Sequence, residues 1–329
     1  MADSSEFTLA VDIGGTTIKA GIVDKQGKII EKRSENTPGA QDNTAFLNSL
    51  GSILDFLFSR HGLPSSVGIG SPGPLDIQKG KIISSANMPA IRDCNIVEFV
   101  QKKINNPNIP VHLDNDANCA GLGQLYFGMG RGHDNFAVFT LGTGVGGGLI
   151  LEKNIFRGYN GNGFEIGHIP VLDMALMDLL QNKKLTIRRC GCSAMGCLET
   201  FSSAMAVSEN YHSLLHAGSP PLGKSTEKLT AREIADLARG NDENAQLSYQ
   251  IAGHALGLAI TSVTHLLNLP LFILTGGMAG AGDLLKPHIQ KVVQSRVFPV
   301  FKNRLEIVFT EGDADSGILG AAGLGHAIR

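Results

Sequence analysis

Short runs of apolar residues, each long enough for one strand or one helix, alternate along the chain with glycine-rich and polar turns. Residues 42–60 carry apolar side chains three or four positions apart, which is the spacing of a helix with one buried face. Residues 7–13 form an unbroken apolar run, which is typical of a strand. The same rules predict strands at residues 7–13, 18–23, 28–32, 67–70, 111–113, 135–141, 149–151 and 271–275, a further strand from residue 155, and helices at residues 42–60, 96–104, 117–127 and about 245–267.

The alternation of strands and helices predicts an α/β fold whose sheets are covered by helices on both sides. The order strand, glycine turn, strand, polar turn, strand occurs twice, beginning at Phe7 and again at Asn135. We interpret this recurrence as an internal duplication of the architecture. Two similar halves imply a cleft between them, and such a cleft is the usual place for a small-molecule site.

The composition narrows the class of protein. A length of 329 residues suggests about two domains, and an apolar share of 43% allows substantial cores, which excludes general disorder. Lys and Arg number 28 against 30 Asp and Glu, so the formal net charge is −2. This balance gives no electrostatic basis for binding nucleic acid or an anionic membrane, and we expect neither among the partners.

Cysteine usage and the N-terminus predict the compartment. The chain has five cysteines, and an odd number argues against a secreted disulfide framework. The first six residues include no basic side chain, so we expect no signal peptide. The long uncharged stretch at residues 244–282 contains histidines, glutamines and a proline, so we interpret it as buried helix and strand rather than a membrane span. These features predict a cytoplasmic protein.

In each repeat, one glycine turn follows the first strand. In the first, Gly14 and Gly15 let backbone N–H groups converge on an anion, and Thr16 and Thr17 add hydroxyl donors. Asp12, at the end of the preceding strand, is suited to holding Mg²⁺ through water.

The second turn is the run from Gly142 to Gly148. Either turn alone is equally consistent with an ordinary tight hairpin, but two at matching places favour a pair of loops that bind a polyphosphate. Neither has the spacing of a P-loop or of a Rossmann fingerprint.

Three polar residues, Asp114, Asn115 and Asp116, follow a predicted strand and precede a predicted helix. Ligands bind at such strand ends in α/β proteins. One of the three would suffice to cap the helix, which is the common role of such residues. The cluster therefore suggests, in addition, a carboxylate that accepts a proton from a substrate hydroxyl. Asn87, before Met88 and Pro89, is a weaker candidate and has the pattern of a turn residue.

A thiol cluster is the most specific chemical signal in the chain. His168 in the segment Glu165–His168 and the closely spaced Cys190, Cys192 and Cys197 offer four ligands suited to tetrahedral Zn²⁺. The alternative is three small buried hydrophobes and a core histidine. Four protein ligands would leave no open position, so the zinc would be structural. Glu165 and Glu199 flank the ligands, and their carboxylates and the His168 ring suit sugar hydroxyls, whereas Cys94 and Cys119 are expected to be packing residues.

Several short segments of the chain resemble the ROK sugar kinases of the hexokinase–actin-like superfamily. In order along the chain they are DIGGTT, NDAN, LGTGVGGG, EIGH, the CxC and GCLE segments and LTGG. The resemblance covers almost the whole chain. It implies a two-domain hexokinase/actin-like fold, each domain a mixed β-sheet flanked by helices, with a central cleft. It also implies transfer of the ATP γ-phosphate to a hexose hydroxyl, usually O6, with Mg²⁺ and a structural zinc.

The resemblance also implies roles for individual residues. It places the smaller domain at residues 1–116 plus about 312–329, and the larger domain, with the zinc site, at about 117–311. Asp116 matches the catalytic base. The other matches are Asn115, Glu165, His168 and Glu199 for sugar binding; His168, Cys190, Cys192 and Cys197 for zinc; Gly14, Gly15, Thr16, Thr17, Gly142, Thr143, Gly144, Gly146 and Gly147 for the phosphates; and Gly276 and Gly277 for the nucleoside.

Two departures from the family pattern concern the zinc loop. Ser193 stands where the family has glycine, which alters the turn without removing a ligand. Residues 171–189 resemble an inserted short helix close to the sugar-binding segment, which leaves substrate choice and subunit contacts open. The repressor branch of the family has an N-terminal DNA-binding domain, and because only eleven residues precede Asp12, we expect no such domain here.

We therefore expect ATP-dependent phosphorylation of glucose to glucose 6-phosphate by a homo-oligomer, either a dimer or a tetramer. A kinase for N-acetylglucosamine or N-acetylmannosamine is an alternative. The same contacts to the other hydroxyls would serve all these sugars, so only the space beside C2 distinguishes such a kinase from a glucose kinase. A non-catalytic sugar sensor is an alternative of a different class.

Overall fold

The computed structural model describes residues 6–38, 42–85, 88–215, 228–310, 312 and 315–327. The chain divides into two compact units. Unit 1 comprises Met1–Val138, Gly148–Phe164 and Ala314–Arg329, and unit 2 comprises Phe139–Gly147 and Glu165–Asp313. The sequence-based division, with its first boundary at residue 116, stays a prediction.

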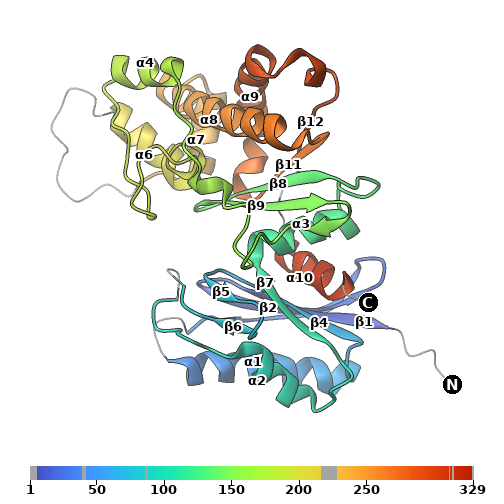
Figure 1. The fold of residues 1–329 in the computed structure, drawn as a ribbon. Helices are drawn as coiled ribbons and strands as arrows, with labels where there is room; N and C mark the ends of the chain where they lie inside the picture. The colour runs from blue at the N-terminus through green and yellow to red at the C-terminus, as the bar shows by residue number, and fades with distance from the viewer. Residues whose placement is uncertain are drawn as a thin grey trace. The chain divides into compact units, whose positions relative to one another are not determined.

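Unit 1 is built on a five-stranded sheet with the strand order β3-β2-β1-β4-β7 (Figure 1). The first three strands are antiparallel, as short turns between consecutive strands require. Strand β4 is parallel to β1, and β7 is parallel to β4. The bounds are β1 (Phe7–Ile13), β2 (Thr17–Asp24), β3 (Ile29–Asn36), β4 (Ser66–Ser71) and β7 (Val111–Asn115), with a small hairpin of β5 (Leu75–Asp76) and β6 (Lys81–Ile82).

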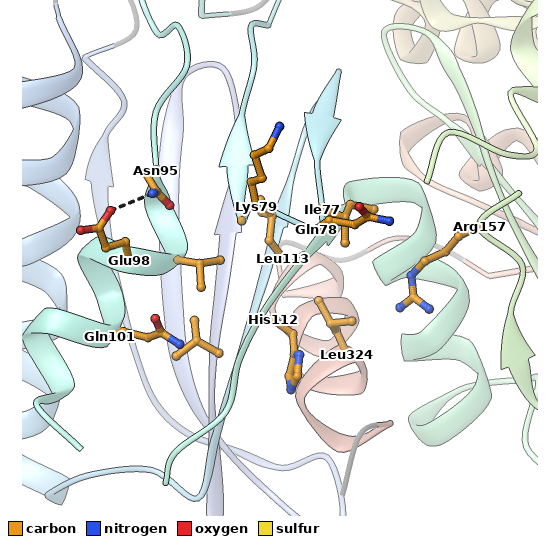
Figure 2. A pocket seen from close by; sticks show the side chains of 13 residues that line it. Ile77, Gln78, Lys79, Asn95, Glu98, Gln101, His112, Leu113, Arg157 and Leu324 are labelled. Carbon is orange, nitrogen blue, oxygen red and sulfur yellow. Dashed lines mark hydrogen bonds between the residues drawn. The ribbon is translucent and has the colours of Figure 1, made fainter. Parts of the chain in front are cut away.

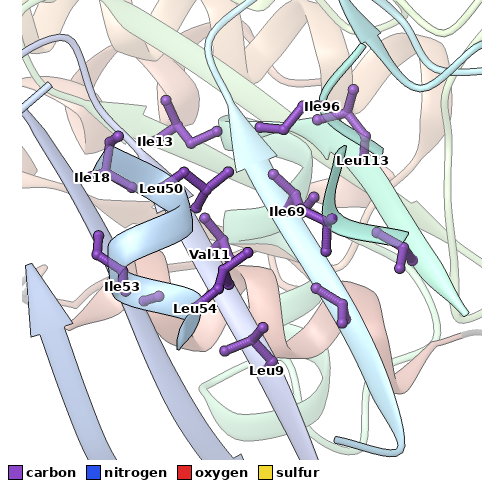
Figure 3. Packing of buried hydrophobic residues seen from close by; sticks show 14 of the residues in the cluster. Leu9, Val11, Ile13, Ile18, Leu50, Ile53, Leu54, Ile69, Ile96 and Leu113 are labelled. Atoms are coloured by element: carbon purple, nitrogen blue, oxygen red, sulfur yellow. The ribbon is translucent and has the colours of Figure 1, made fainter. Parts of the chain in front are cut away.

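The core of unit 1 follows from the two-residue period of its strands. Leu9, Val11 and Ile13 of β1 point to the face covered by α1 (Asn43–His61) and α2 (Ile96–Ile104) (Figure 3). Ala10, between them, points to the opposite face, where α10 (Ser316–His326) packs. The prediction of a sheet covered on both sides is therefore confirmed for this unit.

Two helices of unit 1 pack so closely that glycine backbone meets glycine backbone. A Cβ built on Gly123 of α3 (Asp116–Phe127) would lie 3.0 Å from the Cα of Gly320 in α10. A Cβ on Gly320 would lie 3.0 Å from the backbone carbonyl carbon of Cys119. Real Cβ atoms do not approach so closely without displacement, so α3 and α10 need these glycines.

The second sheet has the strand order β10-β9-β8-β11-β12, which repeats the order of the first. Its last two strands are parallel, and β9 and β10 are antiparallel, as in the corresponding part of the first sheet. The internal duplication expected from the sequence is thereby confirmed. The bounds are β8 (Phe136–Leu141), β9 (Val145–Leu151), β10 (Asn154–Ile155), β11 (Leu271–Thr275) and β12 (Glu306–Phe309).

Two predicted strands have different bounds in the structure. The third strand was expected at residues 28–32, but β3 continues to Asn36, which pairs with Thr17 of β2. Its second half is charged and exposed, as an edge strand allows, so no apolar pattern marks it. Residues 145–148 were expected in a turn but belong to β9. Glycine is needed there for close packing, since a Cβ on Gly148 would lie 2.6 Å from the Ala117 carbonyl oxygen.

Unit 2 holds most of the helices that the structure describes. The predicted long helix is confirmed as α8, which begins at Glu243 because Asp242 caps it by accepting a hydrogen bond from the Ala245 N–H at 2.8 Å. The described helices of unit 2 are η1 (Ile166–His168), α4 (Met174–Asn182), α5 (Glu199–Ser202), α6 (Ala204–Leu215), α7 (Ala231–Arg239), α8 (Glu243–Leu267), η2 (Gly277–Ala281), α9 (Gly282–Arg296) and η3 (Pro299–Phe301).

The inserted segment at residues 171–189 contains the expected short helix, α4. Asp173 caps it and also accepts hydrogen bonds from His254 Nε2 at 3.1 Å and from the Arg296 guanidinium, so the insertion is fixed to α8 and α9. At its other end Arg188 donates to the carbonyl of Thr200 in α5. Among the described helices, none combines the length and apolar character needed to cross a bilayer.

Candidate active site

Asp116 lies at the junction of β7 and α3, where the sequence predicted a proton-accepting carboxylate. Asn115 caps the helix, because its Oδ1 accepts a hydrogen bond from the Ala117 N–H at 2.9 Å. The same N–H also reaches Asp116 Oδ1 at 2.8 Å. The cap is supplied by Asn115, and Oδ2 of Asp116 makes no hydrogen bond within the described residues.

The carboxyl groups of Asp12 and Asp116 both titrate above the ordinary range of aspartate. Burial raises the pKa of Asp12 to about 6, mainly because the charged carboxylate loses water. The positive charge of Lys19 lowers this pKa, and the negative charge of Asp116 raises it. Desolvation also raises the pKa of Asp116, against the lowering effect of the Ala117 N–H. The Asp116 side chain is nevertheless exposed, which is compatible because one face of the carboxyl can meet water while protein surrounds the rest. Raised carboxyl pKa values are typical of general bases.

The first glycine turn joins β1 to β2 and is closed by its own backbone. The N–H of Gly14 donates to the Thr17 carbonyl at 2.9 Å. Thr37, just after β3, donates its hydroxyl to the Gly14 carbonyl at 2.7 Å. The N–H groups of Gly15 and Thr16 have no acceptor within the described part of the chain, and the Thr16 side chain is exposed. The donors available to an anion are therefore those of Gly15 and Thr16.

The second glycine turn, residues 142–144, joins β8 to β9 and has a matching construction. Here the N–H of Gly142 donates to the Gly144 carbonyl at 3.0 Å. A Cβ on Gly144 would lie 2.2 Å from Glu199 Oε2, so the carboxylate in its present position requires glycine there. The N–H groups of Thr143 and Gly144 have no acceptor among the described residues. Gly146 and Gly147 lie in β9 rather than in the turn.

Glu199 and the segment that carries Glu165 and His168 both contact Val145, the first residue after this second turn. Glu199, at the start of α5, accepts a hydrogen bond from the Val145 N–H at 3.1 Å. In the segment that carries Glu165 and His168, Gly167 lies directly against the Val145 carbonyl. The side chains of Glu165 and His168 are exposed, as ligand-binding groups require.

The four expected zinc ligands come together in unit 2. The donor atoms of His168, Cys190, Cys192 and Cys197 all lie within 4.8 Å of one another. Cys190 Sγ is 3.4 Å from His168 Nδ1, and the Sγ atoms of Cys192 and Cys197 are 3.6 Å apart. Tetrahedral Zn²⁺, with Zn–S of about 2.3 Å and Zn–N of about 2.0 Å, would hold such atoms about 3.6 to 3.8 Å apart. The residues present therefore fit the ion.

The remaining predicted residues fall at separate places. Gly276, with φ of +95°, follows β11, and a Cβ there would lie 2.6 Å from the Leu141 carbonyl oxygen, so it packs beside the second glycine turn. Gly277 begins η2. Asn87 lies outside the described residues. Cys94 and Cys119 are both buried, as expected for packing residues.

A cavity of about 580 Å³ opens elsewhere in unit 1, beside α2 and β7 (Figure 2). Its lining includes His112, whose Nε2 is buried without a hydrogen-bond partner in the described chain. Three of its charged side chains are already neutralised, in the ion pairs Lys79–Asp76, Lys102–Glu98 and Arg157–Asp114. Nothing in this lining therefore selects a charged ligand.

Sequence reasoning missed two residues that contact the candidate site. Arg157 donates its Nε–H to Asp114 Oδ2 at 2.7 Å, one step from the Asn115–Asp116 pair. Gly317, in the first turn of α10, lies so close to Asp12 that a Cβ on it would be 2.1 Å from Asp12 Oδ2. A single arginine in a loop and one glycine among 41 carry no signal in the sequence alone.

The structure thus assembles two sets of predicted residues, one in each unit. Unit 1 holds Asp12, the first glycine turn, Asn115 and Asp116. Unit 2 holds the second glycine turn with the carboxylates, imidazole and thiols around Glu199, and the Gly276–Gly277 pair.

Comparisons with known proteins find sugar kinases that match most or nearly all of this chain. A glucokinase from Thermotoga maritima is 32% identical over 326 residues, covering 96% of this chain and 96% of that protein. An N-acetyl-D-glucosamine kinase from Salmonella dublin is 29% identical over 270 residues, covering 82% of this chain and 83% of that protein. The crystal structure of a ROK family glucokinase from Streptomyces griseus, in complex with glucose and AMPPNP, matches with a TM-score of 0.76 at 27% identity, covering 97% of this chain and 99% of that one.

The family itself follows from the extent of the match. The model of the ROK family matches residues 8–328, nearly the whole chain. The fold is accordingly the two-sheet α/β fold of the ROK hexokinases. With its motifs, its fold and its relatives in agreement, this chain belongs to the ROK family.

Proposed function

We propose that this protein is a glucokinase, which transfers the γ-phosphoryl group of ATP to the 6-hydroxyl of glucose. The observation that carries the proposal is the Asp116 carboxylate, exposed, with a raised pKa and with an oxygen free of protein hydrogen bonds in the described chain. The choice of glucose is supported by the glucokinase that is 32% identical over nearly the full length.

In this proposal Asp116 accepts the proton of the sugar 6-hydroxyl as that oxygen attacks the γ-phosphorus of ATP. The bond from the γ-phosphorus to the β,γ-bridging oxygen breaks, and ADP leaves. Phosphoryl transfer needs little covalent help from the protein, so most of the rate comes from positioning and charge stabilisation. Asn115, Glu165, His168 and Glu199 would bind the sugar hydroxyls, with Asn87 as a weaker candidate.

The phosphates would be bound by backbone N–H groups of the two glycine turns. The N–H groups of Gly14 and Gly142 already donate within their own turns, so their contribution is the shape of the turn. The N–H groups of Gly15 and Thr16, and of Thr143 and Gly144, are the donors we assign to the phosphates, with the Thr17 hydroxyl beside them. Gly146 and Gly147 would keep the backbone close to the nucleotide, and Gly276 and Gly277 would border the nucleoside.

Asp12 is the residue that would hold Mg²⁺. Its carboxylate is half-buried and its pKa is raised to about 6 by desolvation, so a nearby cation would offset the unfavourable burial of its charge. Bound there, Mg²⁺ supplies positive charge to the phosphates. Gly317 leaves the room that the Asp12 carboxylate occupies.

We also propose that the thiol cluster holds a structural Zn²⁺, because its donor spacing suits the ion. Four protein ligands leave no open position, so the ion would fix the loop that ends in Glu199. Metal analysis of the purified protein should find about one zinc per chain. Cys192→Ser should lower that ratio, whereas Cys94→Ala, a buried cysteine outside the cluster, should keep it. Wild-type protein with far less than one zinc would contradict the assignment.

A kinase for N-acetylglucosamine is the second candidate, favoured by the Salmonella dublin relative. Both reactions would use the same base and phosphate donors, so the pocket beside C2 of the sugar decides. The test is ADP release measured over glucose, N-acetylglucosamine, N-acetylmannosamine, mannose and galactose, with the phosphorylated product identified by mass spectrometry. The glucokinase proposal expects the highest kcat/KM with glucose. A higher value with an N-acetylated sugar selects the second candidate, and binding without any product selects a non-catalytic sugar sensor.

The proposal also covers the compartment, the oligomeric state and the partners of the protein. We propose a cytoplasmic homo-oligomer that acts on a small sugar and does not bind nucleic acid. Light scattering on the purified protein measures the mass of the assembly, which should be a multiple of the 34.8 kDa chain.

A further inference from the structure

Asp114, the residue before the Asn115–Asp116 pair, is a carboxylate with no exposure to solvent. Its Oδ1 accepts hydrogen bonds from the Asn115 backbone N–H and from Asn118 Nδ2, each at 2.8 Å. Its Oδ2 accepts one from Arg157 Nε at 2.7 Å. A buried carboxylate persists only where its charge is compensated, so each of these bonds matters to the local structure.

Arg157 supplies the positive charge of this group. It lies shortly after β10, and 43 residues separate it from Asp114 in the sequence. Its side chain is one-third exposed, at 33%, and borders the cavity of unit 1 (Figure 2). No other cationic side chain forms an ion pair with Asp114 in the described part of the chain.

The bonds made by Asp114 lie on both sides of Asp116 in the sequence. The Asn115 N–H is one residue before Asp116, and the Asn118 amide is two residues after it. Asp114 thereby fixes the end of β7 to the first turn of α3, and Asp116 is the first residue of that helix. The orientation of the Asp116 carboxylate is set by this short segment.

We infer that Arg157 is a positioning residue for the phosphoryl-transfer step: by holding the buried Asp114 carboxylate, it fixes the segment from which Asp116 reaches the sugar hydroxyl. This inference rests on the proposed function, in which Asp116 is the base. Without the guanidinium, Asp114 would be a buried anion that must turn toward water or take up a proton, and either change loosens its bonds to Asn115 and Asn118. Small displacements of a catalytic group reduce turnover more than they reduce binding.

The test compares Arg157→Gln with wild type in the full-length protein. We expect kcat with glucose and ATP to fall by about tenfold to a hundredfold, as misplacement of a catalytic group by about 1 Å does. The dissociation constant for glucose, measured by calorimetry without ATP, should stay within about threefold. Hydrogen exchange at residues 114–118, followed by mass spectrometry, should be faster because the Asn115 N–H loses a firmly held acceptor. Arg157→Lys, which keeps the charge, should recover part of kcat.

Arg60→Gln is the matched control, because it removes an arginine from a surface ion pair with Glu31 in the same unit. It should leave kcat and the exchange at residues 114–118 unchanged. Retention of kcat within twofold in Arg157→Gln overturns the inference. So does a loss of kcat matched by an equal loss of glucose affinity with no faster exchange, which indicates a general structural role. If wild type phosphorylates no hexose, the proposed function fails, and the exchange comparison still decides whether Arg157 holds the segment.

Discussion

The carboxylate of Glu199 accepts a hydrogen bond through Oε2 from the backbone N–H of Val145, at 3.1 Å. Its other oxygen, Oε1, lies 3.7 Å from the thiol sulfur of Cys190. Glu199 therefore lies between the second glycine turn and the thiol cluster. A change in either should therefore displace this carboxylate, which we propose binds the sugar.

Gly144→Ala tests this relationship. The added methyl would lie 2.2 Å from Glu199 Oε2, and the end of a flexible side chain moves more readily than backbone, so Glu199 should be displaced. We expect KM for glucose to rise at least about tenfold, the loss of one charge-assisted hydrogen bond, while the protein stays folded. Steady-state kinetics and a melting curve measure both.

Gly142→Ala serves as the control for folding, because a Cβ on Gly142 meets no atom within 4 Å. Its melting temperature should match that of wild type. An unchanged KM for glucose in Gly144→Ala would show that Glu199 does not bind the sugar from its present position.

Asp116→Ala should reduce kcat by about a thousandfold or more, because a general base contributes about 10² to 10⁴ and the substituted protein offers no replacement. Glucose affinity and melting temperature should change little, since the side chain is exposed and Asn115 supplies the helix cap. Asp55→Ala, a surface acid paired with Lys103, is the matched control and should keep full turnover. Turnover within tenfold of wild type in Asp116→Ala would argue that another group takes the proton.

Asp12→Asn should stabilise the magnesium-free protein at pH 8. Because the folded pKa of Asp12 is about 6 and its ordinary value is 3.8, the folded state binds this proton more tightly than the unfolded chain. The free energy of unfolding of the wild-type protein therefore falls as the pH rises from about 4 to about 6. The full shift corresponds to about 3 kcal/mol, and partial solvent access and the coupling to Asp116 reduce the expected gain to about 1 to 2 kcal/mol.

Urea unfolding at two pH values measures this effect. The gain in the free energy of unfolding should be fully present at pH 8 and much smaller at pH 4, where the folded carboxyl is protonated and the unfolded one is about half protonated. Turnover should fall in the same variant if Asp12 holds Mg²⁺. Destabilisation at pH 8 would mean that the Asp12 carboxylate makes favourable interactions stronger than its desolvation.

Ser193→Gly should stabilise the zinc loop. Ser193 has φ of +72°, in the left-handed region, which costs a residue with a Cβ about 1 to 2 kcal/mol. Glycine removes that strain but loses about 0.5 to 1 kcal/mol in chain entropy, so the net gain should be about 0.5 to 1 kcal/mol. Ala194→Gly, at the next position and without a positive φ, should instead lower the free energy of unfolding. Denaturant titrations at equal zinc content compare the two.

Several parts of the fold could be predicted because burial leaves apolar runs and regular apolar spacings in the sequence. The run at Phe7–Ile13 and the spacing in α1 indicate a strand and a helix without further information. The second half of β3 could not be predicted, because an exposed edge strand carries charges instead of alternation. The glycines at 146–148 misled the prediction, because glycine marks turns as well as close backbone packing. Only the structure shows that they lie in β9 and that Gly148 packs against the Ala117 backbone.

The residues of the candidate site also fall into those that could be predicted from the sequence and those that could not. The thiols and His168 could be predicted as a cluster, because short spacings and few ligand types limit what Cys190, Cys192 and Cys197 can do. Asp116 could be proposed from its place between a strand and a helix. Arg157 and Gly317 could not be found, because each acts through a contact with a residue far away in the sequence, and nothing local marks a long-range partner.

The glycine contact between α3 and α10 has a consequence for how this enzyme can change over time. Alanine favours helices over glycine by about 1 kcal/mol per residue, so each of these positions would gain from mutation if it stood alone. A methyl at Gly123 or Gly320 would instead wedge the two backbones apart, and the helix that begins with Asp116 would shift with them. We expect substitutions to be tolerated on the outer surfaces of these helices. At the contact between them, we expect no single substitution of Gly123 or Gly320 to raise stability.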